Sequence, residues 1–306
     1  MMVVGFDTSN YTTSIAAFDG CSGKNCSRLL DVRPGELGLR QSDAVFAHVK
    51  RLPELADALF RSVERSAIQA VGVSTRPRAV EGSYMPCFLA GVSAAQTLAA
   101  ALDVPCYSFS HQQGHVAAAL WSANRMDLME KPHLAWHLSG GTTELLLIEP
   151  QERNVCATQI GGTSDISAGQ IMDRTGKLLQ LQFPSGKALD ALSREVEDPA
   201  RFKVKTNGLS FSFSGLENKI LQYHQQGHSS AETASYAVRS VCDAVVRVTR
   251  EARKLYPGYE VVFSGGVASN SLLREAGREF SAVFAEPALS TDNAMGVAVL
   301  TWLQEA

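Results

Sequence analysis

The chain has 306 residues, with 28 lysines and arginines, 31 aspartates and glutamates, and a net charge of −3 at pH 7. Hydrophobic residues make up 45% of it and charged residues 19%, which excludes a disordered or fibrous protein and suits about two domains with their own cores. The mild acidity excludes a broadly basic nucleic-acid coat, so any contact with RNA must be local or shared with a partner.

The first predicted element is a β-hairpin. Residues 3–6 and 14–18 are apolar and enclose turn-forming residues. A second copy of this pattern lies about 130 residues further on, where apolar residues 134–138 and 144–148 flank Ser139-Gly140-Gly141-Thr142-Thr143. Two hairpins with small, hydroxyl-rich tips indicate an internal duplication.

Helical and extended patterns alternate between the two hairpins. The spacing of apolar residues predicts helices over 42–61 and 86–102, and strands over 70–74 and 104–109. A helix that starts after Ser110 follows. This alternation is typical of parallel α/β layers.

The second half of the chain is richer in helix. Its longest predicted helix covers residues 231–256, and the apolar segment 261–263 is a strand that leads into Ser264-Gly265-Gly266. A helix from about Asn270 follows, and a last apolar helix runs from about Asp292 to Trp302.

We expect two lobes. The first comprises residues 1–107 together with 293–306, and the second comprises residues 108–292 and carries the metal and nucleotide loops. Ligands of such α/β folds bind in the cleft between lobes, against loops at strand ends.

The cysteines, the N-terminal segment and the apolar runs indicate where in the cell the protein is expected. None of the six cysteines forms a C-x-x-C pair, so free thiols are expected. The N-terminus reaches Asp7 without the basic segment of a signal peptide. No apolar run reaches the ~18 residues of a membrane-spanning helix. We therefore expect a cytoplasmic protein that does not bind a membrane.

The sharpest local motif is His111-Gln112-Gln113-Gly114-His115. Ser110 and Gln113 form a predicted capping box, so His111 and His115 stand one turn apart on one helix face. Two such imidazoles can hold one transition metal. The alternative is a pair of unconnected surface histidines, which is the commoner case for a bare H-x-x-x-H spacing.

The same five letters occur again as His224-Gln225-Gln226-Gly227-His228. Gly227 is a helix-stop residue, and Ser229 with Glu232 predicts a capping box for the next helix. This second pair spans a turn, so we interpret it as an exposed loop between helices without a metal.

Three small-residue loops are candidates for binding an anion, because glycine lets backbone N–H groups approach it closely. Each loop is also compatible with a plain tight turn. Two arginines that follow a strand are candidates for pairing with an anion, and the alternative for them is simple solvation. The loops contain Thr8 and Ser9, Ser139 to Thr142, and Gly265 and Gly266, and the arginines are Arg76 and Arg78.

Two carboxylates stand at predicted helix positions. Asp292 precedes the last helix, where it either caps the helix or completes a metal site with the two histidines. Asp173 is either a polar helix position or a ligand-binding group.

These motifs together resemble the tRNA threonylcarbamoyladenosine transferases, a family once called glycoproteases or O-sialoglycoprotein endopeptidases. The resemblance extends nearly from end to end. Its most specific segments are His111 to His115, Leu138-Ser139-Gly140-Gly141-Thr142, Phe211-Ser212-Phe213-Ser214-Gly215-Leu216, and Val267-Ala268-Ser269-Asn270 with Leu273-Arg274.

The resemblance implies the actin/hexokinase/Hsp70-like ATPase fold, with two duplicated lobes and a central cleft. It implies one divalent transition metal, iron or zinc, on His111, His115 and Asp292. It also implies that the family donor, a threonylcarbamoyl-adenylate, gives its acyl group to a tRNA adenosine. The residues that match the family's adenine-nucleotide or substrate contacts are Ser139, Gly140, Gly141 and the adjacent Thr142, together with Asp173, Gly186 and Asn270.

The chain departs from the family pattern in its polar residues while keeping the metal ligands. Two acids of the first loop are replaced within Asn10-Tyr11-Thr12, and a basic residue after the Ser-Gly-Leu motif is replaced by Glu217. Other segments differ as well. Arg76-Pro77-Arg78 stands where the family has Gly-Pro-Gly, and Thr142 stands where it has a histidine. Ile166 replaces an aspartate, and Gln170 replaces a glutamate. This pattern suggests a divergent paralogue.

Three hypotheses follow. The first is a metal-dependent acyl or carbamoyl transferase that acts on tRNA with the help of homologous protein partners, as a homo- or heterodimer. The second is a non-catalytic or regulatory nucleotide-binding paralogue. The third, a metalloprotease, is the weakest, because Gln112 stands where zinc peptidases carry a glutamate base.

Overall fold

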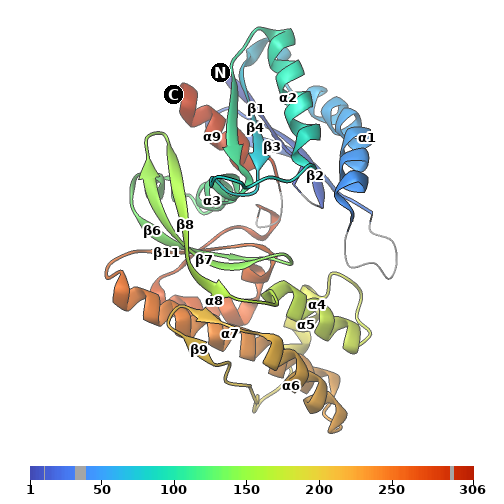
Figure 1. The fold of residues 1–306 in the computed structure, drawn as a ribbon, viewed down its shortest axis with the longest axis vertical. Helices are drawn as coiled ribbons and strands as arrows, with labels where there is room; N and C mark the ends of the chain where they lie inside the picture. Colours follow the sequence, from blue (N-terminus) through green and yellow to red (C-terminus); the bar gives the residue numbers. More distant parts are fainter. Residues whose placement is uncertain (10, 32–38, 290–292) are drawn as a thin grey trace. The chain divides into compact units, whose positions relative to one another are not determined.

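The structure is a computed structural model that describes residues 1–9, 11–31, 39–289 and 293–306, without the side chain of residue 288. The chain forms two compact units (Figure 1). The first consists of Met1–Lys131, Glu149–Ala157 and Asp292–Ala306, and the second of Pro132–Ile148 and Thr158–Thr291.

The first unit is built on a five-stranded mixed sheet. Its strands are β1 (Met2–Asp7), β2 (Thr12–Phe18), β3 (Gly23–Leu29), β4 (Ile68–Arg76) and β5 (Cys106–Ser110). They lie in the order β3-β2-β1-β4-β5. The three strands β1 to β3 are antiparallel, whereas β1, β4 and β5 are parallel, so the predicted first hairpin is confirmed.

Helices cover both faces of this sheet (Figure 1). On one face lie α1 (Gln41–Phe60) and α2 (Phe88–Leu102), and on the other lie α3 (His111–Ser122) and α9 (Met295–Glu305). Short 3₁₀ turns are η1 (Arg65–Ala67) and η2 (Met126–Glu130). The helices predicted over 42–61 and 86–102 are confirmed.

The second sheet has seven strands. They are β6 (His133–Leu138), β7 (Thr143–Gln151), β8 (Asn154–Thr163), β9 (Thr206–Asn207), β10 (Ser210–Phe211), β11 (Val261–Ser264) and β12 (Val283–Phe284). Their order is β12-β11-β6-β7-β8-β10-β9. The helices are α4 (Ala168–Leu178), α5 (Gly186–Ser193), α6 (Ser214–Gln225), α7 (Ser230–Leu255) and α8 (Ser271–Gly277), with 3₁₀ turns η3 (Gly266–Ser269), η4 (Arg278–Phe280) and η5 (Pro287–Leu289).

The two sheets share one topology, and this repeat corresponds to the internal duplication that the two hairpins predicted. Read from the β8 side, the second sheet runs β8-β7-β6-β11-β12, as the first runs β3-β2-β1-β4-β5. In both, an antiparallel hairpin is followed by two parallel strands. The second sheet adds β10 and β9 at its β8 edge.

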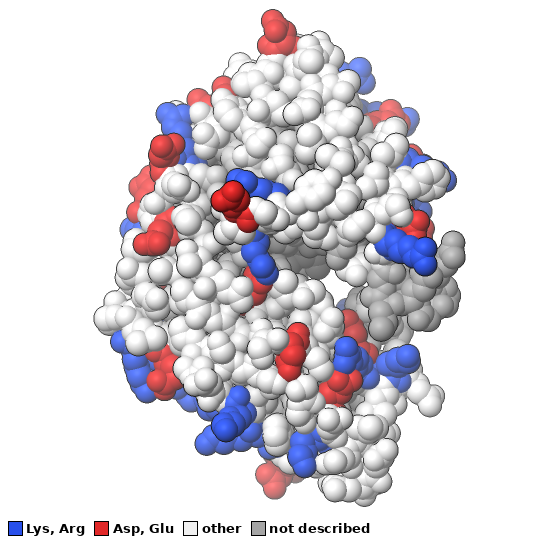
Figure 2. Space-filling model, viewed as in Figure 1, with Lys and Arg blue, Asp and Glu red and all other residues white. Residues whose placement is uncertain are grey.

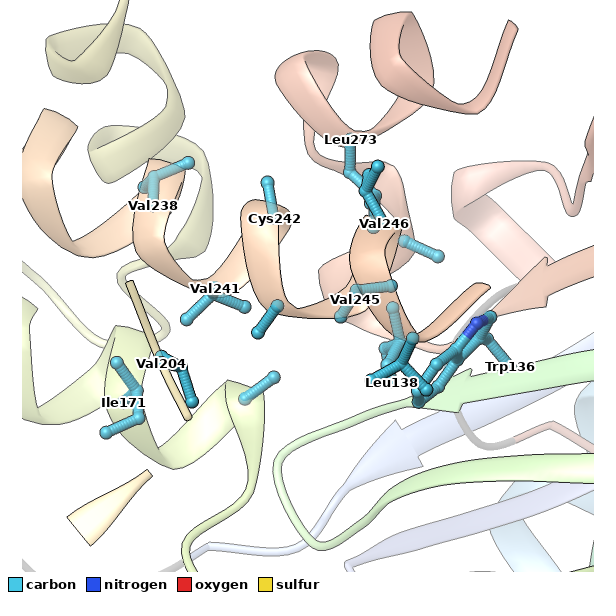
Figure 3. Packing of buried hydrophobic residues seen from close by; sticks show 14 of the residues in the cluster. Trp136, Leu138, Ile171, Val204, Val238, Val241, Cys242, Val245, Val246 and Leu273 are labelled. Carbon is cyan, nitrogen blue, oxygen red and sulfur yellow. The ribbon is translucent and has the colours of Figure 1, made fainter. Parts of the chain in front are cut away.

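The core of the second unit forms between α7 and the sheet (Figure 3). Along α7, Val238, Val241 and Val245 recur at helical spacing and are buried, so the predicted long helix is confirmed. Trp136 on β6 is fully buried, and its indole N–H donates to Thr249 at 2.9 Å. This bond satisfies the polar atom of the largest buried side chain.

Two details differ from the sequence prediction. As a compact unit, the first half of the chain continues past residue 107 to Lys131, because α3 packs along α9. The last helix begins at Met295 instead of near residue 292, and the Asn293 side chain accepts a hydrogen bond from the Met295 N–H at 3.0 Å. Asp292 itself lies outside the described residues.

None of the helices in the described part of the chain is long and apolar enough to cross a membrane.

Candidate functional site

The histidine motif begins α3 as predicted. Ser110 Oγ accepts a hydrogen bond from the Gln113 N–H at 3.2 Å, and the Gln113 side chain accepts from the Ser110 N–H at 2.9 Å, which completes the capping box. The cap fixes the first turn of the helix. His111 and His115 therefore present their rings to one another, with 4.3 Å between ring centroids.

The two imidazoles converge through their Nε2 atoms, which lie 2.9 Å apart. The Nδ1 of His111 lies 2.8 Å from Oδ2 of Asp7, a carboxylate that is 99% buried at the end of β1. Asp7 also accepts a hydrogen bond from the Ser9 N–H at 2.8 Å. Burial alone would raise the pKa of Asp7, but His111 and Ser9 together hold it below its ordinary value.

This arrangement fits a metal. When the His111 Nδ1–H donates to Asp7, the Nε2 of His111 carries its lone pair, and a carboxylate behind a ligating histidine is the usual support of such a ligand. Two nitrogens at about 2.0–2.1 Å from one ion stand about 3 Å apart. Within the described ranges, no group of three His, Cys, Asp or Glu side chains could hold an ion, and the predicted third ligand, Asp292, is outside them.

Sequence reasoning did not identify Asp7 as part of this site. The signal was available in the sheet order, because β1 and β5 both flank β4 in parallel and end at the same edge. An acid at the end of β1 is thereby placed next to a helix that starts at the end of β5.

Thr8 and Ser9, which we predicted to bind an anion, are buried. Thr8 Oγ1 donates to the Cys87 carbonyl at 3.0 Å and accepts from the Gly91 N–H at 3.1 Å. Thr8 therefore ties the β1–β2 tip to the start of α2. Ser9 uses its N–H on Asp7 and so positions the carboxylate behind His111.

A second histidine is buried behind the same hairpin. His48, on α1, is fully buried, and its Nδ1 lies 2.8 Å from Thr13 Oγ1 on β2. Burial lowers its pKa to about 4, an effect that Asp7 opposes and Arg51 reinforces. His48 is therefore neutral at pH 7.

We expect this histidine to make the protein less stable in mild acid. A pKa of about 4 in the folded chain, against about 6.5 when unfolded, means that the unfolded chain binds the extra proton between these values. The free energy of unfolding should fall by up to about 3 kcal/mol from pH 6.5 to pH 4. The free energy of unfolding, measured with urea at each pH in this range, should depend less on pH in His48→Gln than in the unchanged protein. An equal pH dependence in both proteins would contradict the assignment.

The arginine loop after β4 lies beside the histidine helix. Arg76 is exposed at the strand end and Arg78 is half-buried. The Gln112 N–H donates to the Pro77 carbonyl at 3.0 Å, and the Arg78 N–H donates to Ser83 Oγ at 3.0 Å. The backbone of this loop is thus fixed against the first turn of α3.

In the second unit, the Ser139–Thr142 loop forms the tip of the β6–β7 hairpin. Ser139 Oγ accepts hydrogen bonds from the N–H groups of Gly141 (3.3 Å) and Thr142 (3.1 Å). Two loop amides are thus already bonded within the turn. Gly140 and Gly141 have open space where a Cβ would stand, so a ligand can approach the backbone.

The loop is fastened to the start of α4. Ser167 Oγ donates to the Gly140 carbonyl at 2.7 Å, and the Gly169 N–H donates to the Ser139 carbonyl at 3.1 Å. A Cβ on Gly169 would lie 2.5 Å from Gly140 Cα, so only glycine permits this approach. Gln170, a departure from the family pattern, completes a capping box with Ser167.

Asp173 and Gly186 lie near one another in the second unit. Asp173 lies on α4, and its Oδ1 accepts a long hydrogen bond (3.4 Å) from the Ser185 N–H, next to Gly186 at the start of α5. Burial raises the pKa of Asp173. Gly186 has open space at the Cβ position.

Asn270 is the N-cap of α8. Its Oδ1 accepts hydrogen bonds from the Leu272 and Leu273 N–H groups, both at 3.1 Å, and its Nδ2 donates to Asp190 at 2.9 Å. Both ends of the amide are therefore used within the protein. Asp190 is a positioning residue that the sequence did not reveal.

Of the glycine pair before α8, Gly265 is needed for backbone geometry. Gly265 has φ +90°, and a Cβ there would lie 2.3 Å from the Leu138 carbonyl oxygen. This close approach holds the ends of β11 and β6 together. Gly266 has open space and begins η3.

Glu217, a departure from the family pattern, and Asp165, the acid that precedes the departure at Ile166, both have local partners. Glu217 pairs with Arg174 at 2.6 Å, and both side chains are about 40% exposed. Asp165 accepts hydrogen bonds from the Ile166 and Phe213 N–H groups at 2.7 and 2.8 Å. Burial alone would raise its pKa, but the Ser212 hydroxyl and these N–H groups hold it below the ordinary range. Asp165 thus fixes the Phe211–Leu216 motif to the end of β8.

In the second five-letter histidine motif, the two imidazole rings have separate partners. His224 Nδ1 lies 3.2 Å from Thr233 Oγ1, whereas the His228 ring stacks on Tyr223 with 3.6 Å between centroids. Tyr223 also stacks on Tyr236. The turn residues Gln225, Gln226, Gly227 and Ser229 are exposed, so the predicted exposed loop between helices is confirmed, as are the helix stop at Gly227 and the Ser229 cap.

These features define the class of protein: two duplicated α/β lobes of the actin-like ATPase fold, the first with a converging histidine pair and the second with a Ser-Gly-Gly loop. Over 99% of this chain and 98% of the other, the structure resembles component A of (R)-2-hydroxyglutaryl-CoA dehydratase from Acidaminococcus fermentans, with a TM-score of 0.59 and 15% identity. That similarity supports the fold alone.

The chain belongs to the TsaD family, described as tRNA N6-adenosine threonylcarbamoyltransferase, whose pattern matches residues 37–299. It is 31% identical to the tRNA N6-adenosine threonylcarbamoyltransferase of Sulfurihydrogenibium sp. (strain YO3AOP1), over 97% of this chain and 89% of the relative. It is 29% identical to that of Lactococcus lactis subsp. cremoris (strain MG1363), over 89% and 82% of the two chains.

Proposed function

We propose that this protein is a metal-dependent acyltransferase that transfers a threonylcarbamoyl-type group from an adenylate donor to an adenosine of tRNA. The observation that carries the proposal is the convergence of the His111 and His115 Nε2 atoms at 2.9 Å, with a buried carboxylate behind the first. A chance pair of surface histidines has no reason to combine these features.

The residues that would hold the ion are His111 and His115, with Asp292 as the expected third ligand. A bound divalent iron or zinc supplies Lewis acidity toward an oxygen that gains negative charge. Asp7 keeps the His111 Nδ1 protonated, so that Nε2 stays available as a ligand. Ser9 keeps the Asp7 carboxylate oriented through its N–H.

Donor binding is assigned to the second unit. The Ser139–Thr142 loop offers an open backbone edge to an anionic group, and α4 begins directly behind it. Asp173 is the carboxylate that would accept hydrogen bonds from hydroxyl groups such as those of a ribose. The open space at Gly186 leaves room for the sugar beside it.

We expect Asp173→Asn to weaken donor binding about tenfold, because an amide accepts a hydroxyl hydrogen bond less strongly than a carboxylate. Asp173 makes one long hydrogen bond of its own, so folding should be little affected. Calorimetric titration with a non-hydrolysable adenylate analogue measures the effect. Asp198→Asn, at an exposed position of the same unit, is the control, and equal affinities for all three proteins would refute the role of Asp173.

The acceptor is proposed to bind with a partner's help. Figure 2 shows Lys and Arg side chains mixed with Asp and Glu over the face that it draws, without an extended basic area. The chain also has a net charge of −3. Homologous protein partners that add basic surface would supply the missing attraction to phosphates.

The test of this function is transfer of labelled threonine to tRNA by the purified protein, assayed with the family's donor-forming enzyme and partner proteins. Label in tRNA that depends on this chain supports the transferase. Absence of label, with nucleotide still bound, would reject it and leave the regulatory paralogue. Glu217 favours that second candidate, because the resemblance implies a basic residue at this position, whereas here an acid stands there and pairs with Arg174.

A further inference from the structure

A hollow on the second unit is lined by the end of α5, by α8 and by the segment 278–284, and its lining contains none of the residues assigned to the donor. Its volume is about 880 Å³, within the ordinary size range of small-molecule pockets. Three arginines and one glutamate supply its charged side chains, so its lining is clearly positive. The lining residues are Arg194, Ser271, Arg274, Glu275, Arg278, Ser281, Ala282 and Phe284.

Two of the arginines are available to a ligand. Arg194 caps the end of α5 and Arg278 follows α8, and both are exposed. Within the described ranges, neither side chain forms an ion pair or a hydrogen bond. A guanidinium whose donors face solvent in a concave site can bind a phosphate bidentately.

The third arginine is fixed in place. Arg274 Nη2 donates to the Ala285 carbonyl at 2.7 Å, and its guanidinium lies 5.0 Å from the centre of the Phe284 ring. One of its five N–H donors is thus used, and the group is oriented before any ligand arrives. Such pre-organisation lowers the entropy cost of binding.

Neighbouring carboxylates reduce the positive charge only in part, because three arginines face Glu275 and the nearby Asp190, while Glu279 is paired elsewhere. Glu279, next to Arg278, is held by two hydrogen bonds from Arg250 at 2.7 and 2.6 Å. Asp190, which contacts the lining residue Ser271, is engaged by Asn270 and Ser271. Glu275 is the single carboxylate in the lining.

We propose that this hollow binds the phosphate groups of a phosphate ester, with Arg194 and Arg278 as the movable contacts and Arg274 as the fixed one. The ester has two sources, a free diphosphate such as that of a nucleotide, or the backbone of an RNA strand. The proposal adds a site to those that the proposed function uses and does not depend on transfer activity.

The experiment measures binding by the full chain without donor or added metal. Pyrophosphate is titrated by calorimetry, and a labelled single-stranded RNA is titrated by fluorescence anisotropy at several salt concentrations. The test variant is Arg194→Gln/Arg278→Gln. The matched control, Arg201→Gln/Lys203→Gln, removes two exposed positive charges of the same unit outside the hollow.

We expect the test variant to bind pyrophosphate at least tenfold more weakly, with little change in the control and partial recovery in Arg194→Lys/Arg278→Lys. If RNA is the source, RNA affinity also falls, and the slope of log K against log salt decreases by about 1.4 for two lost contacts. If a free diphosphate is the source, RNA binding changes no more than in the control. Pyrophosphate affinities that are equal in the test variant and the control would overturn the proposal.

Discussion

Replacing both His111 and His115 with alanine should lower the affinity for zinc or ferrous iron by at least about a thousandfold and abolish transfer. Both nitrogens that converge at 2.9 Å are lost, and loss of even a supporting residue costs 10–100-fold in metal affinity. The measurement is competition with a chelator of known affinity, together with metal content after anaerobic purification. Metal binding is thus read independently of activity.

The chain supplies a matched control for this experiment. His224→Ala/His228→Ala removes the same residues from the same five-letter sequence, where one ring stacks on Tyr223 and the other contacts Thr233. Metal affinity should not change in this variant. Equal loss of metal in both double variants, or metal retained without His111 and His115, would contradict the assignment.

A third variant distinguishes a residue that binds the metal from one that only supports a metal-binding histidine. Asp7→Asn keeps both imidazoles but weakens the charged acceptor of the His111 Nδ1–H. It should lower metal affinity by the 10–100-fold typical of such supporting residues. A loss as large as that of the double variant would mean that Asp7 acts as a ligand itself.

Much of the fold could be predicted because apolar spacing is strong where an element is buried. The first hairpin, α7 and β11 were predicted within a few residues of their bounds. Strand β3 was not, because the sequence of Gly23–Leu29 is polar and the strand is largely exposed at a sheet edge. Its extended form depends on pairing with β2, which no local pattern reveals.

The site was predictable to the extent that its chemistry is local. The capping box and the i, i+4 spacing placed His111 and His115 on one face. Asp7 could not be paired with His111 from spacing alone, because 104 residues separate them and only the sheet order joins them. Asn270 was predicted as a substrate contact, whereas its hydrogen bonds to Asp190 and α8 become visible only in three dimensions.

Gly296→Ala should be strongly destabilising, because α3 and α9 meet backbone to backbone at this residue. A Cβ on Gly296 would stand 1.8 Å from the carbonyl oxygen of Gly114 and 2.9 Å from the N–H nitrogen of Ala118. Neither atom is the flexible end of a side chain, so the helices would have to separate. We expect a loss of about 3 kcal/mol or more in the free energy of unfolding, measured by urea titration.

Gly114 on α3, whose carbonyl oxygen faces Gly296, provides the comparison. A Cβ on Gly114 would meet the Val297 methyl group at 3.3 Å, a side-chain contact that can relax, and alanine favours a helix interior by about 1 kcal/mol over glycine. Gly114→Ala should therefore change stability by no more than about 1 kcal/mol. Since His115 follows Gly114 directly, separation of the helices in Gly296→Ala should also weaken metal binding. Equal stability of the two variants would mean that α3 and α9 are not in backbone contact here, and the support of the histidine pair would need another explanation.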